Sequence, residues 1–275
     1  MKTRIITGTF LLLFLLAMCI LADTEVFTIA LALVTLIGVY EMLDCTKLKS
    51  NLFIAIPLYL ISVAAPFLMR HFRATVFSHL PKVIIAFLLF ILYVLTVVVF
   101  SHGKLDITEA ISGAMLSLYI IGAMSCIMYV RDLKNGEYYW IFLFIGAWAT
   151  DVFAYFTGKL FGKHKLIPEI SPKKTVEGSI GGTVFCVIFF VVYAIILREV
   201  YHIPVNILIC GITGFLSAIV SQIGDLSMSA IKRHYGIKDF GKLLPGHGGI
   251  LDRFDSIIAV AVVLAIFSSR ATPFM

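Results

Sequence analysis

The chain has 275 residues, of which 60% are hydrophobic and 14% are charged, and its formal net charge is +6. Soluble domains are closer to half apolar and carry about 25% charged residues, so this composition excludes an ordinary soluble fold. The basic residues are scattered over several short segments instead of forming one patch, which argues against a nucleic-acid partner.

Apolar runs recur along the chain, and each is close to the ~20 residues that a helix needs to cross a bilayer. We place them at 5–22, 26–43, 51–69, 83–100, 110–130, 139–158, 179–198, 206–231 and 252–269. The first run is longer than the apolar part of a signal peptide and lacks a clear cleavage site, so we interpret it as a span. No alternating strands of barrel type appear. The sequence therefore predicts an all-α polytopic membrane protein with about nine transmembrane helices.

The basic residues also predict the orientation of these spans. With nine spans, the N-terminus and every loop after an even-numbered span share one side of the membrane. That side carries 15 of the 22 lysines and arginines, and the other side carries the remaining 7. Because cytoplasmic loops are enriched in these residues, we expect the N-terminus to be cytoplasmic.

Polar residues are distributed unevenly between the two halves of the chain. Residues 1–138 are plain apolar runs with short loops, and we interpret them as a scaffold. Residues 139–275 hold nearly all the polar residues at unusual depths, so we expect the catalytic half there. Its two long loops, 159–178 and 232–250, are rich in Lys, Gly and Pro and fall on the predicted cytoplasmic side.

Two aspartates lie inside predicted spans, where charged residues are costly and usually functional. Asp151 and Asp225 each lie seven residues before the cytoplasmic end of a span. At 1.5 Å per residue this is roughly 10 Å below the membrane surface. Two carboxylates at similar depth on different helices predict a shared polar cavity that opens to the cytoplasm.

Further polar residues follow the same helices. Asp252 and Asp255 are spaced i, i+3 at the start of the last span, so they share one helix face. Asp225, Ser229 and Lys232 share one face of the eighth span by the same rule. Taken singly, each acid has a simpler alternative, which is an ion pair with a nearby Lys or Arg that only fixes helix packing.

Clustered carboxylates without His or Cys ligands suit a hard cation such as Mg2+, and lysines beside them suit phosphate groups. Chemistry alone therefore predicts a metal–phosphate site. Asp151 is left with two alternatives: it is a further metal ligand, or it holds Lys173 or Lys174 in place.

One 27-residue segment carries the most specific pattern. It reads Ser229-x2-Lys232-Arg233-x4-Lys238-Asp239-x-Gly241-x2-Leu244-Pro245-x-His247-Gly248-Gly249-x2-Asp252-Arg253-x-Asp255. This segment resembles the signature of the phosphatidate cytidylyltransferases, or CDP-diacylglycerol synthases. A second stretch resembles the same family, namely Asp151-x2-Ala154-Tyr155-x2-Gly158 with the later Ser171-Pro172-Lys173-Lys174-Thr175-x-Glu177-Gly178. The resemblance is strong over 140–260, whereas the first half adds only Tyr40-Glu41.

The resemblance implies a polytopic enzyme that transfers CMP from CTP to phosphatidic acid, giving CDP-diacylglycerol and pyrophosphate. It implies Mg2+ as cofactor, accompanied by a monovalent cation such as K+, with Asp225 and Asp252 as the aspartate pair of the metal centre. It suggests a homodimer in the inner (cytoplasmic) membrane of a bacterium, with the active site facing the cytoplasm.

The mechanism that we expect is an in-line displacement at the α-phosphorus of CTP, helped mainly by positioning and electrostatics. The expected catalytic residues are Asp225, Asp252, Lys238, Arg253 and His247. His247 either hydrogen-bonds a phosphate or stabilises its loop, and the 246–249 backbone offers N–H groups to an anion. The expected substrate-binding residues are Lys173, Lys174, Ser229, Lys232, Arg233, Asp239, Gly248, Gly249 and Asp255.

Two other functional classes and one structural class compete with this hypothesis. A cation-coupled transporter would use intramembrane acids, but it usually shows inverted repeats in both halves, and here the polar residues are confined to one. A polyprenol kinase-like phosphotransferase would also need acids, lysines and Mg2+, and the signature in 229–255 argues against it. A purely structural membrane protein would tolerate neutral residues in place of Asp225 and Asp252.

Overall fold

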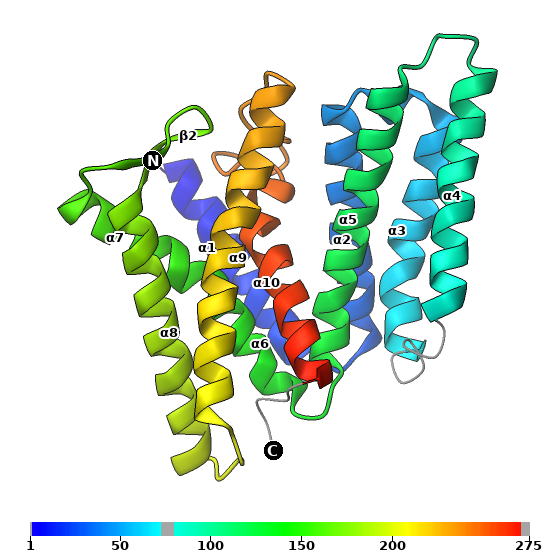
Figure 1. Ribbon diagram of the computed structural model, residues 1–275. Coiled ribbons are helices and arrows are strands. Elements are labelled where there is room, and N and C mark those ends of the chain that lie inside the picture. The colour runs from blue at the N-terminus through cyan, green and yellow to red at the C-terminus, as the bar shows by residue number, and fades with distance from the viewer. Residues whose placement is uncertain (1, 73–79, 271–275) are drawn as a thin grey trace. The chain divides into compact units, whose positions relative to one another are not determined.

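The structure is a computed structural model that describes residues 2–72 and 80–270 (Figure 1). The last five residues of the predicted catalytic half, 271–275, lie outside this part of the chain. Within the described residues the chain is helical apart from its loops and one two-stranded antiparallel hairpin. The prediction of an all-α fold is confirmed.

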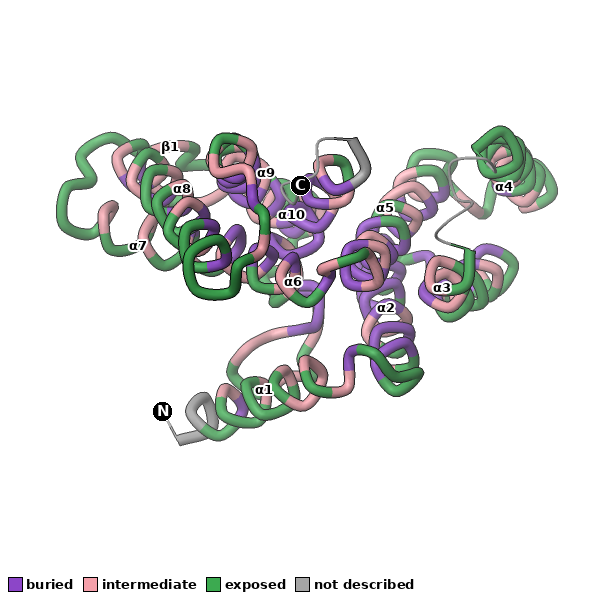
Figure 2. Tube along the Cα trace, turned by 90° about the horizontal axis from the view of Figure 1, so that it is seen from below, coloured by how far each residue is buried: buried purple, intermediate pink, exposed green. Residues whose placement is uncertain are grey.

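The chain divides into two compact units, and the first comprises Met1–Tyr129 together with Ile237–Asp252. Its elements are α1 (Lys2–Ile20), α2 (Glu25–Cys45), the 3-10 turn η1 (Leu48–Ser50), α3 (Leu52–Phe72), α4 (Leu80–Phe100) and α5 (Ile107–Arg131). Figure 2 shows α4 exposed along almost its whole length, and Val94 is its one buried residue. A helix that is apolar on all sides and exposed in this way is suited to lipid contact.

The second unit comprises Val130–Gly236 and Arg253–Met275. Its elements are α6 (Gly136–Phe144), the π-helical turn η3 (Ile145–Ala149), α7 (Thr150–Phe161), β1 (Lys165–Ile167), β2 (Ser171–Thr175), α8 (Val176–Glu199), α9 (Ile207–His234) and most of α10 (Leu251–Arg270). The units therefore do not follow the predicted halves in sequence, because the 237–252 segment belongs with the first unit. The division into a scaffold, residues 1–138, and a catalytic half, residues 139–275, is a statement about function and stays a prediction.

Each of the predicted spans coincides with helix. Seven helical segments among the described residues are long and apolar enough to cross a membrane: α2, α3, α4, α5, the continuous α6–α7 segment, α8 and α9. The described apolar part of α1, Ile6–Ile20, is shorter, and α10 carries Asp252, Arg253 and Asp255 in its first turns. The chain is a polytopic membrane protein, whereas the count of nine spans stays a prediction.

Small residues bring α7 and α8 close together in the second unit. Gly178 and Gly182 are spaced i, i+4 on α8, the small-xxx-small pattern that lets transmembrane helices approach closely. A Cβ on Gly182 would lie 2.7 Å from the Thr150 carbonyl oxygen and 2.9 Å from the Ala154 Cβ. The obstructing atoms belong to the backbone and to a short side chain of α7, so they have little freedom to move away.

Gly182→Ala is therefore expected to lower the free energy of unfolding by about 1–3 kcal/mol, because the added methyl forces α7 and α8 apart. The measurement is unfolding of the purified protein in detergent micelles. Gly211→Ala on α9 is the matched control, since a Cβ there meets Val191 at an ordinary 3.6 Å. Equal stability of the two variants would show that the close α7–α8 contact is not required.

The hairpin between α7 and α8 is fixed at its base by two side chains. Thr175 caps α8, and its hydroxyl accepts a hydrogen bond from the Gly178 N–H at 3.1 Å. The Glu177 carboxylate accepts hydrogen bonds from the backbone N–H groups of Lys163 and His164, at 3.1 and 3.2 Å, and contacts the His164 ring at 2.6 Å. The strand that carries Lys173 and Lys174 is thereby held beside the ends of α7 and α8.

Candidate active site

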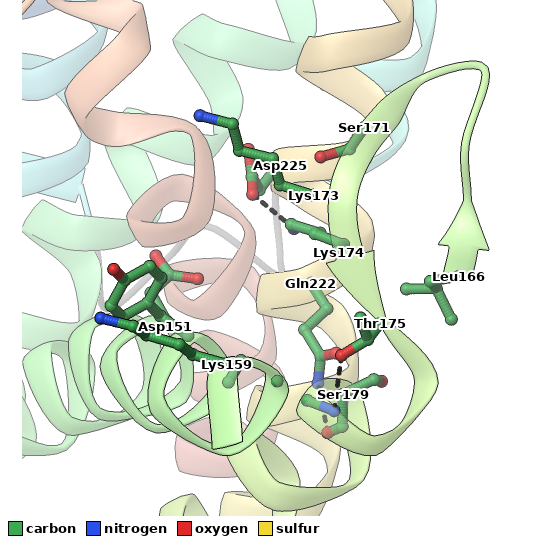
Figure 3. A pocket seen from close by; sticks show the side chains of 14 residues that line it. Asp151, Lys159, Leu166, Ser171, Lys173, Lys174, Thr175, Ser179, Gln222 and Asp225 are labelled. Atoms are coloured by element: carbon green, nitrogen blue, oxygen red, sulfur yellow. Dashed lines mark hydrogen bonds and ion pairs between the residues drawn. The ribbon is translucent and has the colours of Figure 1, made fainter. Parts of the chain in front are cut away.

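A pocket of about 370 Å³ lies within the second unit (Figure 3). It is formed by one side of α7, the hairpin, the start of α8 and the middle of α9. Its lining includes Asp151, Tyr155, Lys159, Leu166, Ser171, Lys173, Lys174, Thr175, Ser179, Gln222 and Asp225. Asp151 and Asp225, which are 74 positions apart in the sequence, thus line one pocket, as predicted, whereas its opening to the cytoplasm stays a prediction.

The central contact of the pocket is an ion pair between Lys174 on β2 and Asp225 on α9. Both side chains are about one-quarter exposed, but the Lys174 Nζ atom itself is buried, so its charge is shielded from water. Figure 3 shows Lys173 beside them on the same strand. The sequence left open whether Asp151 holds one of these lysines, and in the structure it is Asp225 that pairs with Lys174.

Asp151 and Asp255 add two more carboxylates to this region. Asp151 lies two residues after the end of the π-helical turn η3, a distortion that often marks a functional site. Its Oδ2 accepts a hydrogen bond of 3.2 Å from the Ser256 hydroxyl. Asp225 lies close enough to interact electrostatically with both Asp151 and Asp255, and the buried Lys232 interacts with Asp255. Three acids and two lysines from four elements, α7, β2, α9 and α10, therefore lie within interaction range in one unit.

The other end of the pocket is lined by neutral polar groups that sequence reasoning did not single out. Gln222 is buried on α9, one turn before Asp225, and its Nε2 donates to the Thr183 hydroxyl at 3.1 Å and to the Ala218 carbonyl at 3.2 Å. The Ser179 carbonyl is a third acceptor for the same nitrogen, at 3.4 Å. These contacts fix the orientation of the amide. The only sign of Gln222 in the sequence is that an uncharged polar residue stands inside the predicted span 206–231.

The signature loop in the first unit, residues 240–251, is organised by Asp252. The Asp252 Oδ2 accepts hydrogen bonds from the Phe240 N–H at 2.8 Å and the Gly249 N–H at 2.9 Å, so one carboxylate oxygen closes the loop. Gly246 and Gly248 have φ of +78° and +85°, a left-handed conformation that favours glycine. Their presence in the motif follows from the shape of the loop.

The predicted anion cradle of residues 246–249 is partly occupied by the protein's own acceptors. The His247 N–H is donated to the Leu244 carbonyl at 2.8 Å, and the Gly249 N–H is donated to Asp252. The Nδ1 atom of His247 is buried, with no hydrogen-bond partner in the described part of the chain. Substrate contacts by Gly248, Gly249 and His247 stay predictions.

The remaining candidates lie on accessible surface or beside the loop. Lys173, Arg233, Lys238, Asp239 and Arg253 are exposed, and Ser229 is half-buried. Among the described residues there is no cluster of three or more His, Cys, Asp or Glu side chains that could by itself hold a metal ion. Asp225 and Asp252 belong to different compact units, so their sharing of one ion stays a prediction.

Comparison with known proteins gives a consistent result over the whole chain. A model described as the cytidylyltransferase family matches residues 2–270. The chain belongs to this family. It is 37% identical over 279 residues to the phosphatidate cytidylyltransferase of Bacillus subtilis, covering 98% of this chain and 99% of the relative.

Two other phosphatidate cytidylyltransferases are also similar to this chain, one over nearly its whole length and one over about two thirds of it. The phosphatidate cytidylyltransferase of Staphylococcus haemolyticus is 34% identical over 268 residues, which is 97% of this chain and 98% of that protein. The enzyme of the same name from Staphylococcus aureus (strain COL) is 41% identical over 177 residues, which is 63% of this chain. The resemblance first seen in the 229–255 signature is therefore a family relationship that includes the apolar first half.

Proposed function

We propose that the protein transfers the CMP group of CTP to phosphatidic acid, producing CDP-diacylglycerol and pyrophosphate. The observation that carries this proposal is the pocket lined by Lys173, Lys174, Asp151 and Asp225. The chain that forms it aligns over 98% of its length with a phosphatidate cytidylyltransferase. Metal-assisted phosphoryl transfer needs carboxylates to bind the metal ion and cations to offset the phosphate charge, and this pocket contains both.

In the proposed reaction, a phosphate oxygen of phosphatidic acid attacks the α-phosphorus of CTP. A new O–P bond forms while the bond between the α-phosphorus and the bridging oxygen to the β-phosphorus breaks, and pyrophosphate leaves with those electrons. The attacking oxygen is already anionic near neutral pH, so no strong general base is required. Lys173 and Lys174, on the strand that borders the pocket, would offset the charge of the triphosphate.

The donor groups of the pocket fit Mg2+. They are carboxylate oxygens, and Mg2+ is usually held by one or two carboxylates together with substrate phosphates. Asp225, which pairs with Lys174 in this structure, would be one ligand, and Asp151 is a further candidate in the same pocket. Asp252, which is not among the residues that line the pocket, is proposed as the second ligand from the family resemblance alone. When bound, the ion would neutralise charge on the α-phosphate. A monovalent cation such as K+ is proposed as a companion on the basis of the family resemblance alone.

We further propose that the pocket opens to the cytoplasm of a bacterial cell and that the protein lies in the inner (cytoplasmic) membrane. The excess of basic residues on one side of the predicted spans supports this orientation. It also suits the substrates, because CTP is dissolved in the cytoplasm while the acyl chains of phosphatidic acid stay in the bilayer. A homodimer is proposed from the family resemblance.

The test is an assay of purified protein with phosphatidic acid, Mg2+ and CTP labelled on either the α- or the γ-phosphate. We expect α-label to enter the lipid, together with release of one pyrophosphate per lipid product. Transfer of γ-label would instead indicate a lipid kinase. Substrate flux in proteoliposomes without any labelled lipid would indicate a transporter.

A further inference from the structure

Glu41 is a buried acid in the half of the chain that the sequence suggests is only a scaffold. It lies in the last two turns of α2, a helix long and apolar enough to span a membrane, and is 4% exposed. A charged side chain at such a position is costly unless it is fully paired. The contacts that Glu41 makes should therefore explain why an acid stands there.

Both carboxylate oxygens of Glu41 accept backbone hydrogen bonds from the signature loop and the start of α10. Oε1 accepts from the Ile250 N–H and Oε2 from the Leu251 N–H, each at 2.9 Å. These donors are more than 200 positions away in sequence but belong to the same compact unit. An anion at a helix N-terminus is stabilised by the helix dipole and by charge-assisted hydrogen bonds. Glu41 thus occupies the position where a helix N-terminus would otherwise offer N–H groups to a phosphate.

The approach of Glu41 also accounts for two glycines of the signature. A Cβ on Gly241 or on Gly249 would lie 2.4 Å from the Glu41 Oε1. Neither glycine has the positive φ that explains Gly246 and Gly248. Glycine at 241 and 249 therefore leaves room for the carboxylate, which a methyl group at either position would displace from its present place.

Glu41 and Asp252 together hold one short stretch of backbone. The N–H groups of Gly249, Ile250 and Leu251 are donated in turn to Asp252, Glu41 and Glu41. The same Asp252 oxygen also accepts from Phe240. Displacement of the 249–251 backbone would therefore move Asp252, whose Cα follows directly in the chain.

We propose that Glu41 is a positioning residue that sets the conformation of residues 240–252 and thereby the placement of the Asp252 carboxylate for catalysis. The first unit then supplies part of the catalytic apparatus. This inference rests on the proposed function, because its main readout is cytidylyl transfer. An inactive wild-type protein would contradict the proposed function, whereas fully active Glu41 variants would contradict only the inference.

The test compares Glu41→Gln and Glu41→Asp with the wild-type protein. Glutamine keeps the length and one acceptor oxygen but turns an NH2 group toward the second N–H, whereas aspartate keeps the charge on a shorter side chain. We expect kcat to fall about 10- to 100-fold in Glu41→Gln, as for other residues that orient a metal ligand. The KM for CTP should change little, the Mg2+ concentration for half-maximal rate should rise, and Glu41→Asp should recover part of kcat. A general loss of folded protein would lower the rate without changing the Mg2+ dependence.

Two further measurements separate positioning from stability. Amide hydrogen exchange needs no substrate, and it should accelerate at residues 249–251 in Glu41→Gln while the rest of α2 keeps its protection. Gly249→Ala should impair the wild-type protein but add little to Glu41→Ala, because the clash partner of the new methyl is then gone. Glu25→Gln, an exposed acid at the opposite end of α2, is the matched control.

Wild-type kcat and Mg2+ dependence in Glu41→Gln would overturn the proposal. Faster exchange at 249–251 without any loss of turnover would overturn it as well, because the loop conformation would then not matter for catalysis. If Glu41→Gln does not fold, additive effects of Glu41→Asp and Gly249→Ala would be the contradicting result.

Discussion

Asp225→Asn is expected to reduce cytidylyl transfer by about a thousandfold or more while leaving the protein folded. The substitution keeps the shape of the side chain but removes the charge that faces Lys174 and that would hold a cation. Losing one preorganised electrostatic contact at a reacting phosphate costs about 10²–10³ in rate, and a metal ligand carries more than one such contact. The measurement is kcat/KM for CTP with phosphatidic acid, alongside unfolding in detergent. Glu169→Gln, an exposed acid on the hairpin, is the control that should stay at wild-type activity.

The competing explanation is that Asp225 only holds Lys174 in place. In that case Lys174→Met should lower activity as much as Asp225→Asn does, and the double variant should be no worse than either single one. If Asp225 also acts on substrate or metal, Asp225→Asn should be much the more damaging of the two. An active Asp225→Asn protein would remove Asp225 from the proposed chemistry.

Most of the helices could be predicted because a segment that crosses a bilayer must be an apolar run of about 20 residues, which is visible in the sequence. Runs such as 83–100 and 179–198 become α4 and α8, with ends that differ from prediction by a few residues. Hydropathy predicts a membrane span least well where a helix begins with charged residues. α10 starts with Asp252, Arg253 and Asp255, so apolar length alone does not decide whether it spans.

The two acids of the pocket were predictable for a different reason. Asp151 and Asp225 were both found from the cost of a charge inside a span, a rule that needs no knowledge of the tertiary fold. That rule does not indicate which lysine pairs with which acid. The pairing of Lys174 with Asp225 depends on a hairpin within the predicted loop 159–178, whose strands are only three and five residues long.

Long-range contacts were beyond the sequence pattern. Nothing in local periodicity links Glu41 to Ile250, and the sequence therefore assigned the first half a scaffold role. The signature also looks like one functional block, yet its backbone is divided at Gly236 and at Asp252 between two compact units. The spacing of the motif identifies its residues but not their roles. The hydrogen bonds that Glu41 and Asp252 accept from the loop backbone show that Asp252, a residue of the motif, also shapes the loop.

Asp252 is expected to be as important as Asp225, and its two proposed roles can be separated by the choice of substitution. Asp252→Ala removes the acceptor for the N–H groups of Phe240 and Gly249, at 2.8 and 2.9 Å. Hydrogen bonds to charged groups contribute about 1.5–3 kcal/mol each, so the alanine variant should lose loop order and stability as well as activity. Asp252→Asn keeps one side-chain oxygen that can accept both bonds, so its stability and its amide exchange at 249–251 should remain close to wild type.

If the carboxylate charge of Asp252 is required for cytidylyl transfer, Asp252→Asn should nevertheless be about a thousandfold less active than wild type, nearly as impaired as Asp252→Ala. Parallel assays of turnover and amide exchange on the two variants decide the matter, with Asp44→Asn as the exposed control acid in the same unit. A well-ordered Asp252→Asn protein with wild-type turnover would assign Asp252 to the loop alone. The metal pair would then have to be sought among Asp151, Asp225 and Asp255, the three acids that the second unit brings together without it.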